Sequence, residues 1–190
     1  MSKIIYRINV SLNGLIEMPG DSPDWVIADE ELFRYSNNLE RQVGGYLWGR
    51  GMYENNLALW ATADTESMEA YMVDFLEIWK QIPTIVFSST LERVEGNARL
   101  ERGDPVAVVT RLKEQPGPDL SVGGVQLAST LMQAGLVDEY HIFFQPIILG
   151  AGRPIYPALN ESLRLKLVET HTFKKGIVYL RYQCQRRRLS

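Results

Sequence analysis

The stretch Asp119-Leu-Ser-Val-Gly-Gly-Val-Gln126 predicts a short strand over 119–122 that runs through a glycine pair into a helix. The helix pattern continues from Val125 to Ala134 and stops at Gly135. A glycine pair at this position lets the backbone approach a ligand closely and leaves helix N–H groups free to bind an anion. Glycine pairs also form ordinary turns, so this stretch alone leaves both interpretations open.

Two other predicted strands end in residues that suit a phosphate group. Tyr46-Leu-Trp48 is followed by Gly49-Arg-Gly51, and Thr84-Ile-Val-Phe87 is followed by Ser88-Ser-Thr90. The arginine offers a bidentate contact to phosphate, and the serines offer short hydroxyl donors, although a lone arginine is commonly a solvated surface charge. Ligands of open parallel sheets bind at the carboxyl ends of the strands. The coincidence at successive strand ends therefore predicts a cleft for a phosphorylated dinucleotide.

The order of the remaining elements predicts the fold class. Strands and helices alternate along most of the chain, and strands alone follow, which favours an α/β fold with a mostly parallel sheet, helices on both faces and antiparallel C-terminal strands. Residues 104–113 are ambiguous, because their valines favour a strand whereas Asp104-Pro105 is a helix-start pair, and we predict a helix there. The other predicted strands are 3–12, 137–149, 164–169 and 177–185, and the other helices are 28–43 and 65–81.

Composition narrows the possible partners and the cellular setting. The 190 residues, 45% of them apolar, predict one domain spanning 1–190, and a net charge of −3 makes nucleic acid an unexpected partner. No apolar stretch approaches the roughly 20 residues needed to span a bilayer, so we expect a cytoplasmic protein without a membrane partner. Cys184 is the single cysteine, and neither His141 nor His171 has neighbours at metal-ligand spacing, so no metal site is predicted.

Four stretches along the chain form a recognisable set: Ser11-Leu-Asn-Gly14, Leu47-Trp-Gly-Arg-Gly-Met-Tyr-Glu54, Ser88-Ser-Thr-Leu91 and Val122-Gly-Gly-Val-Gln126. In this order and spacing they resemble the reductase domain of bacterial riboflavin biosynthesis (the RibD C-terminal type) and, more distantly, dihydrofolate reductase. A fifth stretch, Pro146-Ile-Ile-Leu-Gly-Ala-Gly-Arg-Pro154, is similar to a late strand-and-loop signature of the family. The likeness extends over nearly the whole chain.

This resemblance implies a dihydrofolate-reductase-like fold and an NADPH-dependent reductase of a small planar heterocycle, of the pterin or aminopyrimidine class. It implies that Gly49, Arg50 and Met52 line the phosphates and ribose of the cofactor. It also implies a homodimer, with contributions from the long strand 137–149 and the loop 150–154. The residues expected at the adenosine 2′-phosphate are Ser88, Ser89 and Thr90, and those at the pyrophosphate are Gly123, Gly124, Val125 and Gln126.

The predicted substrate pocket lies between the first strand, the loop after it and the first helix. The resemblance points there to Asn13, Trp25 and Asp29. Asp29 corresponds to the carboxylate that dihydrofolate reductases place early in their first helix, but it also suits the dipole of that helix. Trp25 could stack on a planar ring or cover the core. No catalytic residue is predicted, because in such reductases the cofactor carries the chemistry.

The chain also departs from its relatives. They often carry Asp at the position of Asn13 and Arg at the position of Ser89, and many are fused to a zinc deaminase domain whose cysteines are absent here. The departures leave two alternatives open. One is a nucleotide-binding module that keeps the fold without catalysis, and the other is a structural oligomer built on the C-terminal strands.

Overall fold

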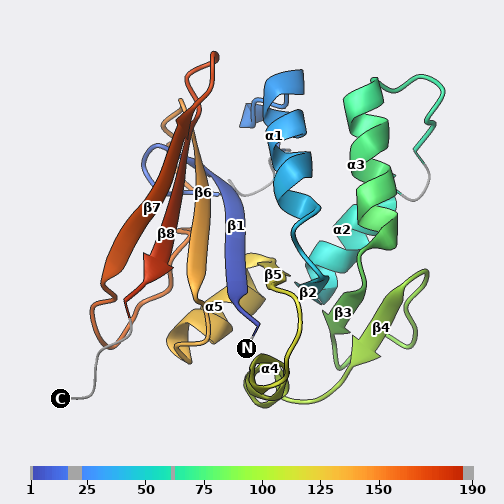
Figure 1. The fold of residues 1–190 in the computed structure, drawn as a ribbon, viewed down its shortest axis with the longest axis vertical. Coiled ribbons are helices and arrows are strands. Elements are labelled where there is room, and N and C mark those ends of the chain that lie inside the picture. Colours follow the sequence, from blue (N-terminus) through green and yellow to red (C-terminus); the bar gives the residue numbers. More distant parts are fainter. Residues whose placement is uncertain (1, 17–22, 61–62, 186–190) are drawn as a thin grey trace.

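The computed structural model describes residues 2–16, 23–60 and 63–185 (Figure 1). These residues form an eight-stranded sheet in the order β4-β3-β2-β5-β1-β6-β8-β7. The strands from β4 to β6 pair in parallel, and β8 pairs antiparallel with both β6 and β7. This arrangement confirms the predicted sheet. The strands are β1 (Ile4–Ser11), β2 (Gly45–Gly49), β3 (Thr84–Phe87), β4 (Ala98–Glu101), β5 (Leu120–Gly123), β6 (Glu139–Gln145), β7 (Leu165–Thr172) and β8 (Val178–Cys184).

Helices cover both faces of the sheet, as predicted (Figure 1). One apolar cluster joins α4 and α5 to the face that carries Tyr6, Leu47 and Val122. Two further clusters lie on the opposite face, where α2 and α3 pack beside Tyr46 and Trp48, and α1 packs near β6 and β8. The helices are α1 (Glu30–Glu40), α2 (Arg50–Trp60), α3 (Ala70–Gln81), α4 (Pro105–Glu114) and α5 (Val125–Gln133), with a short 3₁₀ helix at Pro23–Trp25.

The ambiguous segment before Gln115 is a helix. The side chain of Asp104 accepts a hydrogen bond from the Ala107 backbone N–H at 3.0 Å, and Pro105 occupies the first helical position. Val108 and Val109 are buried on the inner side of this helix. The capping pair therefore overrides the preference of the valines for a strand.

Several predicted boundaries were wrong. Helix α2, which begins directly at Arg50, and strand β4 were not predicted. Helix α3 begins at Ala70 rather than Thr65. The strand predicted over 137–149 is shorter than expected: β6 ends at Gln145, directly before Pro146. Both edges of β6 are paired, with β1 on one side and β8 on the other, so a second copy of the chain cannot add a strand there.

A difference in strand length creates the space for a site. Strand β5 pairs only with the first part of β1, from Ile4 to Tyr6. After Gly123, the β5 segment leaves the sheet and enters α5. Strand β1 continues to Ser11 along β6. The following β1 residues therefore border a gap at the carboxyl end of β5, the position where open parallel sheets bind ligands. Within the described residues, no helix is both long and apolar enough to cross a membrane.

Candidate functional site

A large cleft of about 890 Å³ opens at the carboxyl ends of β2, β3 and β5, and we call it the outer cleft. Three loops or helix starts that are distant in sequence meet around it. The structure thus brings together the three strand ends that the sequence singled out. Every residue predicted to contact the cofactor lines this cleft, namely Gly49, Arg50, Met52, Ser88, Ser89, Thr90, Gly123, Gly124, Val125 and Gln126, and so does Trp25.

The β5–α5 junction has the geometry of an anion cradle. Gly124 is the N-cap of α5 with φ +88°, a conformation that side-chain-bearing residues rarely adopt, and no side chain caps this helix. The first-turn N–H groups of an α-helix have no intrahelical acceptors. A Cβ atom at Gly123 would lie 2.8 Å from the indole of Trp48. The glycine pair is therefore required both by the backbone and by the space beside it.

The ends of β2 and β3 meet across the cleft through a polar loop. The Ser88 hydroxyl accepts hydrogen bonds from the backbone N–H groups of Thr90 at 3.2 Å and Leu91 at 3.0 Å. Arg50 Nη1 lies 3.5 Å from Thr90 Oγ1, and Arg50 Nε lies 3.8 Å from Glu54 Oε2. The arginine is exposed at the first position of α2. A positive charge and several hydroxyl groups therefore face the same solvent-filled space, as a phosphate group requires.

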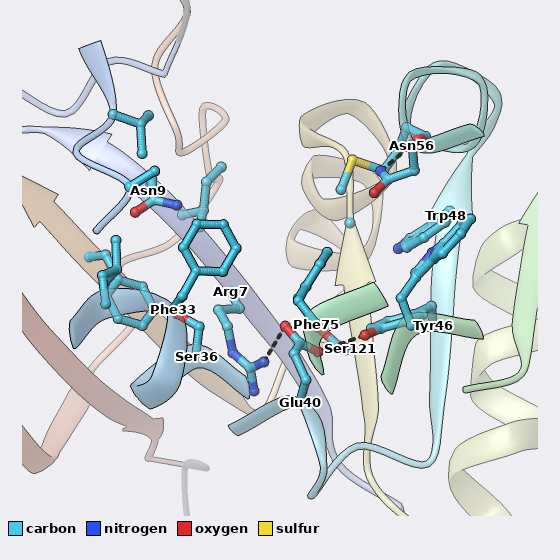
Figure 2. A pocket seen from close by; sticks show the side chains of 18 of the residues that line it. Arg7, Asn9, Phe33, Ser36, Glu40, Tyr46, Trp48, Asn56, Phe75 and Ser121 are labelled. Carbon is cyan, nitrogen blue, oxygen red and sulfur yellow. Dashed lines mark hydrogen bonds and ion pairs between the residues drawn. The ribbon is translucent and has the colours of Figure 1, made fainter. Parts of the chain in front are cut away.

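A second, smaller cavity of about 320 Å³ adjoins the outer cleft, and we call it the inner pocket (Figure 2). It lies among β1, β2, α1, α2 and α3. The two cavities share part of their lining, since Asn9, Met52 and Gly123 border both. Its volume is at the lower end of the range of ligand pockets, roughly 300–1,000 Å³. Most of its wall is apolar, from Ile8, Val26, Ala28, Leu32, Phe33, Trp48, Met52, Phe75, Trp79, Val122 and Phe143.

A buried ion pair lies in the wall of the inner pocket. Arg7 Nη1 is 2.6 Å from Glu40 Oε1, and both side chains are largely shielded from solvent. The Tyr46 hydroxyl donates to Glu40 Oε2 at 2.9 Å. Burial, reinforced by the charge of Glu40, raises the pKa of Tyr46 far above its usual value, so the phenol remains a hydrogen-bond donor. Figure 2 shows these three side chains joined in one chain of contacts.

Asn9 stands on the boundary between the two cavities with a defined orientation. Its Oδ1 accepts a hydrogen bond from Gln145 Nε2 at 2.9 Å, and Gln145 Oε1 in turn accepts from the Ile27 backbone N–H at 3.1 Å. The Asn9 Nδ2 group has no acceptor among the residues that the structure describes. The free amide N–H₂ group is therefore available to a bound ligand.

Two of the three predicted substrate residues lie outside both cavities. Asn13 bonds to Ser11 and to both backbone polar groups of Leu149, at 2.8–3.1 Å, and so ties the end of β1 to the loop after β6. Asp29 caps α1 by accepting from the Leu32 N–H at 3.0 Å, and it lies 3.6 Å from Lys175 Nζ. Asp29 thus serves as the N-cap of α1, in agreement with the interpretation that it interacts with the helix dipole. The third predicted residue, Trp25, lines the outer cleft.

The sequence analysis missed Arg7, Asn9 and Glu40. The available signal was the run Tyr6-Arg-Ile-Asn9, which places two polar side chains within an otherwise apolar strand. Polar residues within a strand that is covered on both faces need specific partners. Glu40 carried no such signal, because the end of a helix is an ordinary place for a charged residue.

Comparisons with known proteins agree with this architecture. The chain is 30% identical over 190 residues to uncharacterized protein YyaP of Bacillus subtilis (strain 168), covering 95% of this chain and 94% of the other. A Shewanella sp. PV-4 structure named for riboflavin biosynthesis has a TM-score of 0.75 at 23% identity, covering 98% of this chain and all of that one. A pyrimidine reductase-like protein of Corynebacterium diphtheriae has a TM-score of 0.61 at 14% identity, covering 97% and 92%.

A two-activity protein of Thermotoga maritima, named as a diaminohydroxyphosphoribosylaminopyrimidine deaminase and 5-amino-6-(5-phosphoribosylamino)uracil reductase, has a TM-score of 0.67 at 17% identity. The match covers 97% of this chain but only 57% of that one. These solved structures confirm the predicted fold. The family model described as the RibD C-terminal domain matches residues 2–179. The chain therefore belongs to the RibD C-terminal domain family.

Proposed function

We propose that this protein is an NADPH-dependent reductase of a small planar heterocycle, of the pterin or aminopyrimidine class. One observation carries the proposal: a cleft that contains an anion cradle adjoins a ring-sized pocket, and the two share Asn9, Met52 and Gly123 in their lining. A bound NADPH would supply a hydride, so the protein needs to position two rings and exclude water rather than provide a nucleophile. The names of the C. diphtheriae and T. maritima relatives support the same reaction class.

The residues of the outer cleft fit NADPH. The glycine pair and the first turn of α5 would hold the pyrophosphate, because no side chain caps the helix and its first-turn N–H groups have no intrahelical acceptors. Arg50 and the hydroxyl groups of Ser88, Ser89 and Thr90 would hold the 2′-phosphate side. Asn9 and Gly123, which line both cavities, would lie beside the nicotinamide. The inner pocket would then take the substrate ring.

The proposal is tested by titrating the purified protein with NADPH while its fluorescence and melting temperature are recorded. We expect saturable binding and a higher melting temperature, since a ligand that binds only the folded state stabilises it. NADPH oxidation with a panel of pterins, aminopyrimidines and quinones then tests catalysis. No thermal shift at millimolar NADPH or NADP would contradict the proposal. Binding without oxidation of any compound would instead support a non-catalytic nucleotide-binding module.

Replacing Arg50 with alanine is expected to raise the dissociation constant of NADPH about tenfold, about 1.4 kcal/mol, because a charge-assisted contact to phosphate is lost. The effect should shrink at high salt, since the side chain is exposed. Isothermal titration calorimetry measures it. Arg99→Ala is the matched control, because Arg99 is an exposed arginine on β4 that lies outside both cavities. If both variants bind NADPH with equal affinity, Arg50 does not contact the cofactor.

We further propose a homodimer that forms through β7 and the segment before it. Strand β7 is an edge of the sheet, and apolar residues on it are about half exposed, with Leu167 at 47% and Val168 at 48%. The pairing register shifts between Leu167 and Glu169, so Val168 stands outside the ladder. Exposed apolar groups on an edge strand are typical of an interface. Others are nearby in the sequence: Ile148, Tyr156, Leu159 and Leu163.

The double substitution Leu167→Lys and Val168→Lys is expected to convert the dimer to a monomer, because it places two charges in an apolar contact. Size-exclusion chromatography with light scattering measures the mass. Glu77→Lys is the control, since Glu77 is an exposed residue of α3 and lies outside β7 and the segment before it. A wild-type mass equal to that of one chain would contradict the dimer itself.

A further inference from the structure

We propose that the inner pocket selects an uncharged ring and excludes substrates that carry a phosphate or carboxylate group. The inference rests on the proposed reductase function and names the substrate class of that same site. It separates this protein from relatives named for phosphoribosyl substrates, such as the T. maritima protein.

The first argument is the charge balance of the pocket. Of the described residues that line it, only Arg7 and Glu40 carry a formal charge, and they lie 2.6 Å apart. A second Arg7 nitrogen, Nη2, donates to the Leu39 carbonyl at 3.3 Å. An anionic ligand would have to compete with Glu40 for this guanidinium, and it would be repelled by the same carboxylate. The pair therefore presents no net charge to a ligand.

The second argument is the composition of the wall. Aromatic rings from α1 and α3 face the indole of Trp48 on β2 across the pocket (Figure 2). The Trp48 ring is itself stacked on Tyr46, with centroids 4.9 Å apart and planes 18° apart, so its position is fixed. A charged group placed among such side chains loses hydration without gaining a partner. A planar ring gains dispersion contacts and stacking there.

The third argument is the kind of polar group that remains. Asn9 offers its free Nδ2 group, and Asn56 uses its Nδ2 on the Met52 carbonyl, which leaves the Asn56 oxygen as an acceptor. Ser36 and Ser121 add hydroxyl groups to the lining. These groups are neutral, and each can match a ring carbonyl, ring nitrogen or amino group. They suit the hydrogen-bonding edge of a heterocycle and provide nothing that balances an anion.

The fourth argument is the position of the anion-binding groups. Apart from Arg7, which lines both cavities and is paired with Glu40, the anion-binding groups lie only in the outer cleft, which NADPH itself would fill. They are Arg50, Arg153, the hydroxyl groups of residues 88–90 and the N–H groups at Gly124. A substrate phosphate that reached them would compete with the cofactor. The arrangement therefore assigns the cofactor's charges to the outer cleft and a neutral ring to the inner pocket.

The test compares pterin with pterin-6-carboxylate, which share a fluorescent ring and differ by one negative charge. Fluorescence titrations at pH 7, with and without saturating NADP, measure both dissociation constants. We expect wild-type protein to bind pterin at least tenfold more tightly than the carboxylate. Equal or tighter binding of the carboxylate would overturn the proposal, and so would failure of both rings to bind at millimolar concentration. The titration without nucleotide does not depend on NADPH. Failure of the selectivity proposal can therefore be told apart from failure of the reductase proposal, which the NADPH titration tests.

Glu40→Gln tests the charge argument directly. Removing the carboxylate frees Arg7 for an anion, so the preference for pterin over its carboxylate should fall by at least tenfold or reverse. Glu77→Gln is the matched control, since Glu77 is an exposed residue of α3 that lines neither cavity. An unchanged preference in a folded Glu40→Gln protein would show that the ion pair does not set the selectivity. If this variant does not fold, the wild-type comparison still decides the proposal.

Discussion

Replacing Gly124 with aspartate is expected to raise the dissociation constant of NADPH by about 100-fold or more, equivalent to about 2.7 kcal/mol. The new carboxylate would stand at the N-cap of α5, where aspartate readily accepts hydrogen bonds from first-turn N–H groups. It would occupy the donors proposed for the pyrophosphate and would repel its charge. Calorimetric titration with NADPH measures the loss.

The Gly124→Asp variant is also expected to fold less stably, because a residue with a side chain at φ +88° costs on the order of 1–3 kcal/mol. The melting temperature of the variant separates this cost from the loss of binding. Gly150→Asp introduces the same charge at an exposed glycine with open space around it, outside both cavities, and should bind NADPH normally. If Gly124→Asp binds NADPH as well as this control does, the cradle at α5 is not the pyrophosphate site.

Replacing Glu139 with glutamine is expected to lower the free energy of unfolding by about 3 kcal/mol at pH 7. The Glu139 carboxylate is 2% exposed and accepts from Lys3 Nζ at 2.7 Å and Arg181 Nε at 2.8 Å. His141 Nε2 lies 3.1 Å away, and the Tyr179 hydroxyl lies 3.0 Å from His141 Nδ1. Removing the carboxylate charge leaves Lys3, just before β1, and Arg181 on β8 without their buried partner. Urea denaturation measures the change.

The protonation states of this network are set by burial and hydrogen bonding. Burial lowers the pKa of His141, so the neutral ring donates from Nε2 to Glu139 and accepts at Nδ1 from Tyr179. Burial also raises the pKa of Tyr179 to about 12, so its hydroxyl stays protonated. Burial alone would raise the pKa of Glu139, but its hydrogen bonds outweigh burial and hold that pKa well below the usual range.

The pH dependence follows from the depressed pKa of Glu139. The unfolded chain takes up a proton near pH 4.3, whereas the folded chain resists it, so the stabilisation is full above that pH and declines as the pH falls below it. The difference between wild type and Glu139→Gln should therefore shrink between pH 4.5 and pH 3. Glu77→Gln, at an exposed position, should match wild type throughout. A difference that grows on acidification would contradict this account.

The sequence predicted the cofactor side of the site better than the substrate side. The residues at 49–52, 88–90 and 123–126 are local strand-end signals, and the topology of a parallel sheet brings such ends to one edge. The inner pocket depends instead on β5 being shorter than β1 and on α1 contacting β1 through Arg7. No short stretch of sequence records those two facts, so Arg7 and Glu40 could not be recognised as a pair.

The missed elements have physical reasons too. Helix α2 begins with Arg50-Gly51 and contains Asn55-Asn56, residues whose propensities favour turns, and it forms because Tyr53 and Met52 pack under the β2 end. Strand β4 carries Arg99 and Glu101 with few apolar residues, and its pairing with β3 supplies its order. Tertiary contacts decided both elements. By contrast, the Asp104-Pro105 cap is local, and it predicted α4 correctly.

A crystal structure of the protein with bound NADP tests the central claim most directly. The account predicts density for the nucleotide in the outer cleft, with the pyrophosphate against the N-terminus of α5, the 2′-phosphate near Arg50 and Ser88, and the nicotinamide beside Asn9 at the mouth of the inner pocket. Nucleotide bound elsewhere, or bound in the cleft with its phosphates away from residues 88–90 and 123–126, would contradict it.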